Sequence, residues 1–330
     1  VIKSPSFLQI SINNGVLYGR LIDIANRGSE IAILAIGMTL TIAVSAGTDI
    51  SVGSVMALVA SCCCTSLVGY GVSSASAVKH PIIFGVLFGI FIGGICGCFN
   101  GFMVSKLKVQ PMVATLVLYT AARAIGLVVS NNQITYVRVK EYKYLGNFWH
   151  IGNWECPIPT PIFVAIICVI LATILLKKTA LGMYIQAVGI NPKAARIMGI
   201  NSALIIFICY VICGLGAGVA GTVASSRIYS ADSNNIGLNF EMDAILAVAL
   251  GGNSLAGGKF SLAGSIIGAY TIQALSTTLL AFGVKTEQAP VIKAIVIIII
   301  VAIQAPAIQS YIKNRKARKA SATGGEAVAK

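Results

Sequence analysis

The chain has 330 residues, of which 57% are hydrophobic and only 10% are charged, whereas about 25% of the residues in a soluble domain carry charge. Most of the chain must therefore lie in lipid. No room is left for a soluble catalytic domain, because each membrane-spanning helix takes about 20 residues. In a membrane protein, a formal net charge of +14 indicates either how the chain is oriented in the membrane or an affinity for anionic lipid. We therefore expect membrane lipid as a partner and no nucleic acid.

Nine apolar runs, each bounded by polar or helix-breaking residues, are predicted to cross the membrane. They are 31–46, 52–72, 81–104, 111–130, 160–176, 202–226, 244–256, 261–282 and 289–305. We expect a further helix to precede Val1, because the sequence does not begin with Met and soon turns polar. The predicted fold is an all-α polytopic membrane protein of about ten helices, with one transmembrane domain (1–312) and a basic cytoplasmic tail (313–330).

The positions of the basic residues predict how the chain is oriented. If the ten-helix protein begins in the cytoplasm, the loops 106–110 and 177–201 and the tail all face inward. The inward segments then hold 13 of the 24 Lys and Arg residues and the outward segments hold nine, as the positive-inside rule requires. The run from Lys313 to Lys319 either binds an anionic cytoplasmic leaflet or serves only as a solvated signal that fixes orientation.

The first unusual segment, Gly47 to Ser54, places a carboxylate between two apolar runs with no polar loop around it. It predicts a helix broken inside the bilayer, in which a side chain of the segment caps the second half. A carboxylate at this depth needs a partner or water, so it either caps the helix or lines a polar path, and the two roles are compatible. Arg123, in the middle of its run, is expected to face the bundle interior. The polar residues assigned to the predicted path are Thr48, Asp49, Ser51, Asn100 and Arg123.

A second short run, 244–256, closes on paired glycines and small polar residues before another helix starts. The similarity of the two segments predicts an internal repeat whose broken helices face one central path. The residues of this second break are Gly251, Gly252, Asn253 and Ser254. The glycine-rich stretch is not a phosphate loop, because Gly258 stands where that motif requires Lys. We expect this chain to bind no cofactor or metal.

The inward loop 177–201 contains a short helix with clear limits. Asn191 can cap this helix, Pro192 fits its first position, and Gly199 can end it. Barely two turns are not stable alone, so the helix must pack either on the chain's own helix ends or on a partner protein. The residues of this predicted docking segment are Asn191, Pro192, Lys193, Ala194, Ala195, Arg196, Ile197, Met198 and Gly199.

In these segments the chain resembles the permease subunits of bacterial ATP-binding-cassette (ABC) importers for pentoses and hexoses, the ribose and galactose group. The similar segments are GMTLTIAVSAGTDISVGSVMAL, FNGFMVSKLKVQPMVATL, KKTALGMYIQAVGINPKAARIMGI and EMDAILAVALGGNSLAGGKFSLAGSIIGA. Within that group, three stretches look most like a galactofuranose-type permease, namely LYGRLIDIANRG, KTALGMYIQAVGIN and ADSNNIGLNFEMDAILAV.

The resemblance implies a transport subunit of the bacterial plasma (inner) membrane and not an enzyme. Two permeases, identical or related, would form the pore, while a partner ATPase binds ATP and Mg and an external binding protein delivers a sugar. The family's coupling helix corresponds to Asn191–Gly199. Two positions depart from the family, since Thr48 replaces the commoner Ile and Asn253 replaces Thr, Ser or Gly. The alternative is a self-contained secondary transporter or channel for a small polar solute. Proton coupling is disfavoured because Asp49 is the only acid expected well inside the membrane.

Overall fold

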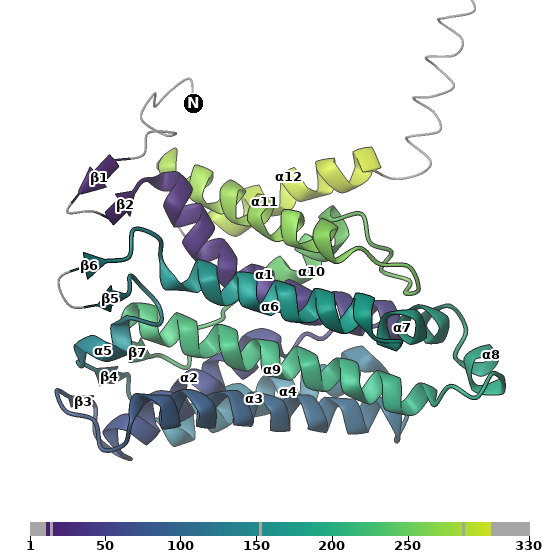
Figure 1. Ribbon diagram of the computed structural model, residues 1–330, viewed down its shortest axis with the longest axis horizontal. Coiled ribbons are helices and arrows are strands. Elements are labelled where there is room, and N and C mark those ends of the chain that lie inside the picture. Colours follow the sequence, from purple (N-terminus) through teal and green to yellow (C-terminus); the bar gives the residue numbers. More distant parts are fainter. Residues whose placement is uncertain (1–10, 14–15, 152–153, 286–287, 305–330) are drawn as a thin grey trace, which may run out of the picture. The chain divides into compact units, whose positions relative to one another are not determined.

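The computed structural model describes the chain except for residues 1–10, 14–15, 152–153, 286–287 and 305–330. The described residues are mainly helical and confirm the predicted all-α membrane fold (Figure 1). They fall into two units, 1–277 and 278–330, which are treated separately below, and the single domain over 1–312 stays a prediction. The predicted basic tail, 313–330, lies outside the described residues.

The helices of the first unit are α1 (Arg20–Ser45), α2 (Val52–Val68), α3 (Ile82–Ser105), α4 (Pro111–Val129), α5 (Lys140–Lys143), α6 (Thr160–Lys178), α7 (Leu181–Ile190), α8 (Pro192–Ile197), α9 (Ser202–Ile228) and α10 (Phe240–Leu250). The sequence of α11 (Leu262–Ala281) crosses the boundary between the units, and α12 (Ala289–Gln304) belongs to the second unit. In the first unit α9 packs against α1, α2 and α3, and α1 also packs against α6, α7 and α10.

The strands are short and lie in the loops. They are β1 (Ser11–Asn13), β2 (Val16–Tyr18), β3 (Ser74–Ala75), β4 (Thr135–Val137), β5 (His150–Ile151), β6 (Trp154–Glu155) and β7 (Ser230–Ala231). In the three-stranded sheet the central β4 is parallel to β3 and antiparallel to β7. This sheet ties together three loops that are far apart in the sequence, at the ends of α2, α4 and α9.

Five helices of the described part are long and apolar enough to cross a membrane, namely α1, α3, α4, α6 and α9. Four of them match predicted runs closely, because breaker or polar residues mark both of their ends: 81–104, 111–130, 160–176 and 202–226. The run 52–72 is shorter in the structure, since α2 ends at Val68 and Gly69 takes a φ of 108°. The total of about ten spans stays a prediction.

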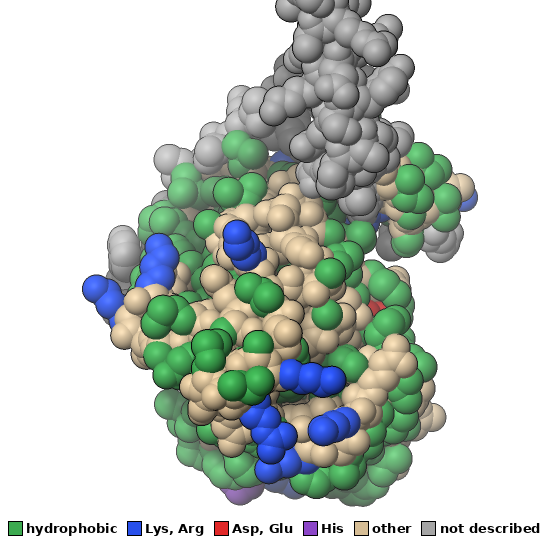
Figure 2. All heavy atoms as spheres, turned by 90° about the vertical axis from the view of Figure 1, so that its right-hand side faces the viewer, with side chains coloured by type: hydrophobic (Ala, Val, Ile, Leu, Met, Phe, Trp, Pro, Cys, Tyr) green, Lys and Arg blue, Asp and Glu red, His purple; other side chains and the backbone are tan. Residues whose placement is uncertain are grey.

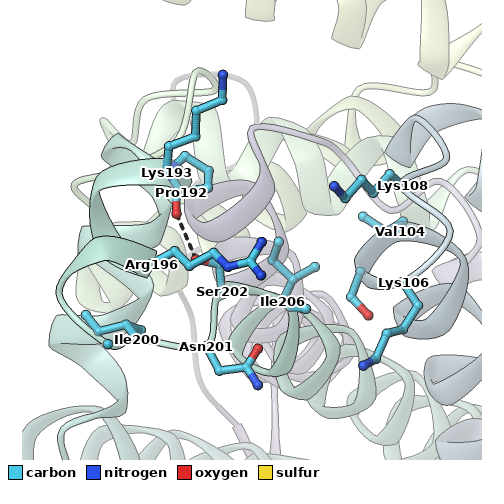
Figure 3. A pocket seen from close by; sticks show the side chains of 13 residues that line it. Val104, Lys106, Lys108, Pro192, Lys193, Arg196, Ile200, Asn201, Ser202 and Ile206 are labelled. Atoms are coloured by element: carbon cyan, nitrogen blue, oxygen red, sulfur yellow. Dashed lines mark hydrogen bonds between the residues drawn. The ribbon is translucent and has the colours of Figure 1, made fainter.

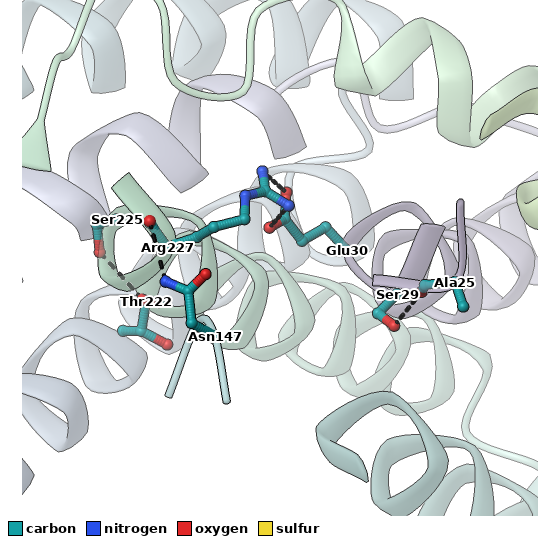
Figure 4. Close-up of polar contacts among 7 residues, drawn as sticks. All are labelled: Ala25, Ser29, Glu30, Asn147, Thr222, Ser225 and Arg227. Atoms are coloured by element: carbon teal, nitrogen blue, oxygen red, sulfur yellow. Dashed lines mark hydrogen bonds and ion pairs between the residues drawn. The ribbon is translucent and has the colours of Figure 1, made fainter. Parts of the chain in front are cut away.

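The predicted start of the first run, 31–46, is wrong, because α1 begins at Arg20 and has 26 residues. Its polar residues are accommodated by partners. Glu30 is fully buried and forms a two-point ion pair with Arg227 of α9, with Nη1 to Oε1 at 2.8 Å and Nη2 to Oε2 at 3.1 Å (Figure 4). Ser29 donates to the carbonyl oxygen of Ala25 one turn earlier, at 2.8 Å. A polar side chain does not end a buried helix when such a partner exists.

The run 244–256 is wrong at both ends for a related reason. The helix α10 begins at Phe240 and ends at Leu250, and it packs on α1 and α2 so that Glu241 and Asp243 are buried. Asp49 is therefore not the only buried acid among the described residues. That it is the only acid well inside the membrane stays a prediction.

A line of glycines holds α3 close to α9. Along α3, glycine recurs every fourth residue from Gly85 to Gly101. A Cβ added to Gly97 would lie 2.6 Å from the carbonyl oxygen of Tyr210, and one added to Gly93 would lie 2.6 Å from that of Gly214. In lipid, where no hydrophobic force drives helices together, such close backbone approach supplies the packing that holds them.

We therefore expect Gly97→Ala to destabilise the protein by about 1–3 kcal/mol, because the added methyl group meets backbone that cannot move aside. The matched control is Gly94→Ala on the neighbouring face of α3. There the Cβ would contact only the flexible Leu215 side chain, at 3.1 Å. Thermal unfolding in detergent, followed by circular dichroism, measures both variants, and equal melting temperatures for the two would contradict the proposed role of this contact.

Candidate functional site

The first break separates α1 from α2, as predicted. The last helical residue is Ser45, and Ala46 takes the left-handed conformation (φ 51°), with its N–H donating to the carbonyl oxygen of Ile42 at 3.0 Å. A non-helical stretch then runs to Ser51, after which α2 starts at Val52. The two helices therefore share a short irregular connection whose backbone groups need partners at membrane depth.

Asp49 supplies several of these partners. Its Oδ1 accepts hydrogen bonds from the backbone N–H of Ser51 at 3.0 Å and from the Ser51 hydroxyl at 2.6 Å. Asn100 on α3 reaches the same place, with Nδ2 2.9 Å from Ser51 Oγ and 3.4 Å from both Asp49 oxygens. All three side chains are at most 2% exposed. Asp49 thus binds the N–H group of Ser51, the residue just before α2, while none of the described side chains caps the first N–H groups of the helix itself. The cluster fixes the break to α3.

A second contact fixes the break to α4. The Thr115 hydroxyl accepts from the backbone N–H of Ile50 at 3.3 Å and lies 3.5 Å from the carbonyl oxygen of Thr48. The Thr48 hydroxyl itself has no hydrogen bond among the described residues, and the residue is half-buried. Thr48 is therefore held by its backbone, while its side chain faces a less enclosed space than Asp49.

Arg123 faces the protein interior as expected, but at a different place. Its Nη1 donates to the carbonyl oxygens of Ser233 at 2.7 Å and Asn234 at 2.9 Å, and its Nε lies 3.4 Å from Ser54 Oγ. It holds the turn that leads from β7 into α10. The structure therefore does not bring Arg123 into the Asp49 cluster.

The second break follows α10. Gly251 ends the helix and Gly252 has a φ of 76°. Asn253 then joins both sides of the break, since its Nδ2 donates to the carbonyl oxygen of Val248 at 3.0 Å and to Ser265 Oγ at 2.8 Å. Asn253 is 9% exposed, whereas Gly252 and Ser254 are exposed. The position where this chain departs from the family thus has a defined structural task.

The two breaks are connected through the end of α1. Ser265 accepts a hydrogen bond from the Thr39 hydroxyl at 2.6 Å, which extends the Asn253 network to α1. The backbone N–H of Gly258 donates to the carbonyl oxygen of Ala43 at 2.9 Å. That carbonyl lies in the last turn of α1, where carbonyl groups lack helical partners. The end of α1 is thus a shared boundary of both breaks, although the polar path itself stays a prediction.

The predicted cytoplasmic helix has the expected limits. Asn191 Oδ1 accepts from the backbone N–H groups of Lys193 at 3.0 Å and Ala194 at 3.1 Å, and Gly199 takes a φ of 83° after the helix. Of the two alternatives for its packing, contact with the chain's own helices applies to one face of α8, and docking of the other face on a partner stays a prediction. Ala195 is completely buried among residues of α1, α7 and α9, whereas Ile197 is 88% and Met198 69% exposed.

Sequence analysis missed a polar cavity where the loops of the three-stranded sheet meet α1 and α9. Its volume is about 340 Å³, and Glu30, Arg227, Asp232, Asn235 and Tyr136 are among the residues that line it. Nearby, Tyr142 is fully buried and its hydroxyl lies 2.7 Å from Ser225 Oγ; burial raises the pKa of Tyr142 well above its ordinary value. The one signal for this cavity in the sequence was the carboxylate of Glu30, just before run 31–46.

Long apolar helices, polar helix breaks and an exposed short helix beside them are typical of a membrane transport subunit. Residues 20–301 match the family described as the permease component of branched-chain amino acid transport systems. The chain belongs to this permease family. It is a transport subunit, not an enzyme, and a multi-pass protein of the bacterial inner membrane.

Curated relatives cover nearly the whole chain. It is 40% identical to the galactofuranose transporter permease protein YtfT of Escherichia coli, over 96% of this chain and 88% of that protein. It is 38% identical to the fructose import permease protein FruF of Bifidobacterium longum (98% and 88% covered) and 37% identical to the ribose import permease protein RbsC of Escherichia coli (90% and 87% covered). The resemblance to sugar-importer permeases is confirmed.

The Asp49 cluster yields a testable prediction. Asp49→Leu should lower the free energy of unfolding by about 2–4 kcal/mol, because it leaves the buried donors of Ser51 and Asn100 without their acceptor. Asp49→Asn keeps an oxygen at the same position and should cost about 1 kcal/mol or less. Thr48→Val is the control, since that hydroxyl has no partner in the described part of the chain. Denaturation in mild detergent compares the three variants, and a Leu variant as stable as the Val control would refute the role of Asp49 as the acceptor that holds the first break.

Proposed function

We propose that the chain is the membrane-spanning permease of an ABC importer that moves a monosaccharide, a pentose or hexose, into the cell. An external binding protein delivers the sugar, and a separate ATPase subunit binds ATP and Mg and supplies the energy. Similarity over nearly the full chain to permeases named for galactofuranose, fructose and ribose supports a sugar as the substrate. The structural observation that supports it best is α8.

The exposed face of α8 is suited to dock on the ATPase. Ile197 and Met198 present apolar surface to solvent beside Lys193 and Arg196, a mixture that favours a protein partner over water. The opposite face is anchored, because Ala195 packs among α1, α7 and α9. A push on the exposed face is therefore transmitted to helices of the membrane bundle rather than absorbed by a loose loop.

The anchored face leads directly to the two helix breaks. The cluster around Ala195 includes Leu40, Ala43 and Val44 of α1, and Ala43 accepts the hydrogen bond from Gly258 in the second break. A displacement of α8 on ATP binding would thus reach both breaks through the end of α1. We propose that the path is lined by the exposed or half-buried residues Thr48, Gly252 and Ser254. The buried side chains of Asp49, Ser51, Asn100 and Asn253 support these residues from behind. Arg123 and Gly251 fix the neighbouring turns.

A second permease, an identical copy or a related chain, would complete the pore. In this arrangement the sugar passes small polar side chains and free backbone groups without tight binding, so that most of the selectivity lies in the external binding protein. Conduction needs weak contacts along the route, because a tightly held solute would not leave.

Reconstituted transport tests this function. The chain is incorporated into liposomes with its ATPase, and the binding protein loaded with radiolabelled galactofuranose, fructose or ribose is added outside. We expect uptake of at least one of these sugars only when ATP, ATPase and binding protein are all present. Uptake that proceeds without the ATPase would favour a self-contained transporter instead.

Docking of the ATPase on α8 gives a second prediction. Met198→Glu should lower sugar-stimulated ATP hydrolysis by about tenfold or more, because a charge replaces apolar surface at the centre of the contact. Met183→Glu on α7 is the matched control, since Met183 has the same exposed fraction, 69%, as Met198. Size-exclusion chromatography checks that both variants stay folded. Equal hydrolysis by the two variants would place the docking surface elsewhere.

A further inference from the structure

A second large cavity lies between α8 and the loop that joins α3 to α4. Its volume is about 570 Å³, and it is lined by Ser105, Lys106 and Lys108 on one side and by Pro192, Lys193 and Arg196 on the other, with the first turn of α9 between them. Four of its lining residues are cations and none is acidic. Figure 3 shows Arg196 and Lys108 extending toward one another from opposite sides.

The cations of this cavity lack counter-ions. Among the residues that the structure describes, none of the four side chains makes an ion pair or a hydrogen bond. Figure 2 shows Lys and Arg side chains gathered on this end of the first unit, with little Asp or Glu among them. Like charges held around one cavity repel each other, so an anion bound between them would lower the energy of the arrangement.

Two further features indicate a prepared site. The Ser105 side chain is only 7% exposed, yet its hydroxyl has no hydrogen bond in the described part of the chain, and a buried hydroxyl without a partner is costly. Lys108 has a φ of 54°, a left-handed conformation that costs a non-glycine residue free energy and that clusters at ligand sites. An oxygen-rich ligand in the cavity would satisfy the first feature and explain the second.

The surface that leads to the cavity is apolar. Along α3, exposed side chains follow one another at helical spacing and form a stripe, which consists of Phe84, Phe88, Phe91, Ile95, Phe99 and Phe102. The next position of the same stripe, one turn further on, is Lys106. A lipid-facing stripe that ends in unpaired lysines matches a molecule with an apolar tail and an anionic head.

We propose that this cavity binds the phosphate group of an anionic phospholipid from the cytoplasmic leaflet. Lys106, Lys108 and Arg196 surround the phosphate, the Ser105 hydroxyl donates a hydrogen bond to it, and the acyl chains lie along the α3 stripe. The proposal rests on the proposed function only for the assignment of this end of the molecule to the cytoplasm. An acidic segment of a protein partner fits less well, because it would bind the cations but leave the apolar α3 stripe uncovered.

Native mass spectrometry of the purified full chain, released from detergent with phosphatidylglycerol or phosphatidylcholine, tests this site. The wild type should retain phosphatidylglycerol in preference to phosphatidylcholine. The double variant Lys106→Gln with Lys108→Gln should lose about thirtyfold in phosphatidylglycerol affinity, at about tenfold or less for each lysine, and Ser105→Ala should weaken binding by a smaller factor. Lys178→Gln, an exposed lysine outside the cavity, is the control and should bind normally.

Two outcomes would overturn the proposal. If the double variant retains phosphatidylglycerol but no longer assembles with the ATPase, the cavity receives an acidic protein segment. If excess inorganic phosphate displaces the lipid completely, the site is one for a free anion. Circular dichroism confirms that each variant is folded. Because lipid binding is measured without ATPase, binding protein or sugar, its failure is distinguishable from a failure of the transport function.

Discussion

The architecture depends on one constraint, which is that backbone N–H and C=O groups inside a membrane must find partners within the protein. An unbroken helix meets this condition by itself, but each of the two breaks exposes several such groups. At the first break Asp49 accepts the N–H of Ser51, and at the second Asn253 bridges the sides of the gap. The carbonyl group of Ala43 receives its donor from Gly258 in the other break. The two breaks are therefore linked through the last turn of α1, a helix that is buried from Gly28 to Val44.

Close helix packing follows from the same surroundings. With apolar lipid outside, burial of apolar side chains contributes little to association, so the helices gain energy by bringing their backbones near each other. The α3 glycines meet α9 through Gly93 and Gly97, and Gly37 of α1 approaches Cys213 of α9 from another side, where a Cβ would lie 2.7 Å from the Cys213 Cα. With its C-terminal end also held by the Glu30–Arg227 ion pair, α9 is the element around which α1 and α3 are positioned.

Sequence reasoning succeeded where structure is decided locally. The cap at Asn191, the proline after it and the glycine at the end predicted α8 to within about two residues, because all three act within one turn. It failed at the starts of α1 and α10, since whether Glu30 or Glu241 is tolerated in a buried helix depends on a partner elsewhere in the chain. Arg227 is almost 200 residues from Glu30, and no spacing rule connects them. The glycines of α3 could have been noticed from their regular four-residue spacing, which is a known feature of packed membrane helices.

The two faces of α8 differ, because one is buried in the helix bundle and the other is exposed. If Ala195 were as exposed as Ile197, a bound ATPase could move the helix without moving the bundle, because a segment of two turns has little rigidity of its own. Its burial in one apolar cluster with Leu40 and Ile205 makes α8 part of the same packed body as the end of α1, and packed bodies transmit displacement rather than deform. The polar groups nearest to that end are those of the two breaks. A transport cycle built on this geometry needs no long chain of moving parts, because the helix proposed to meet the ATPase and the residues proposed to face the solute are separated by little more than the last turns of α1.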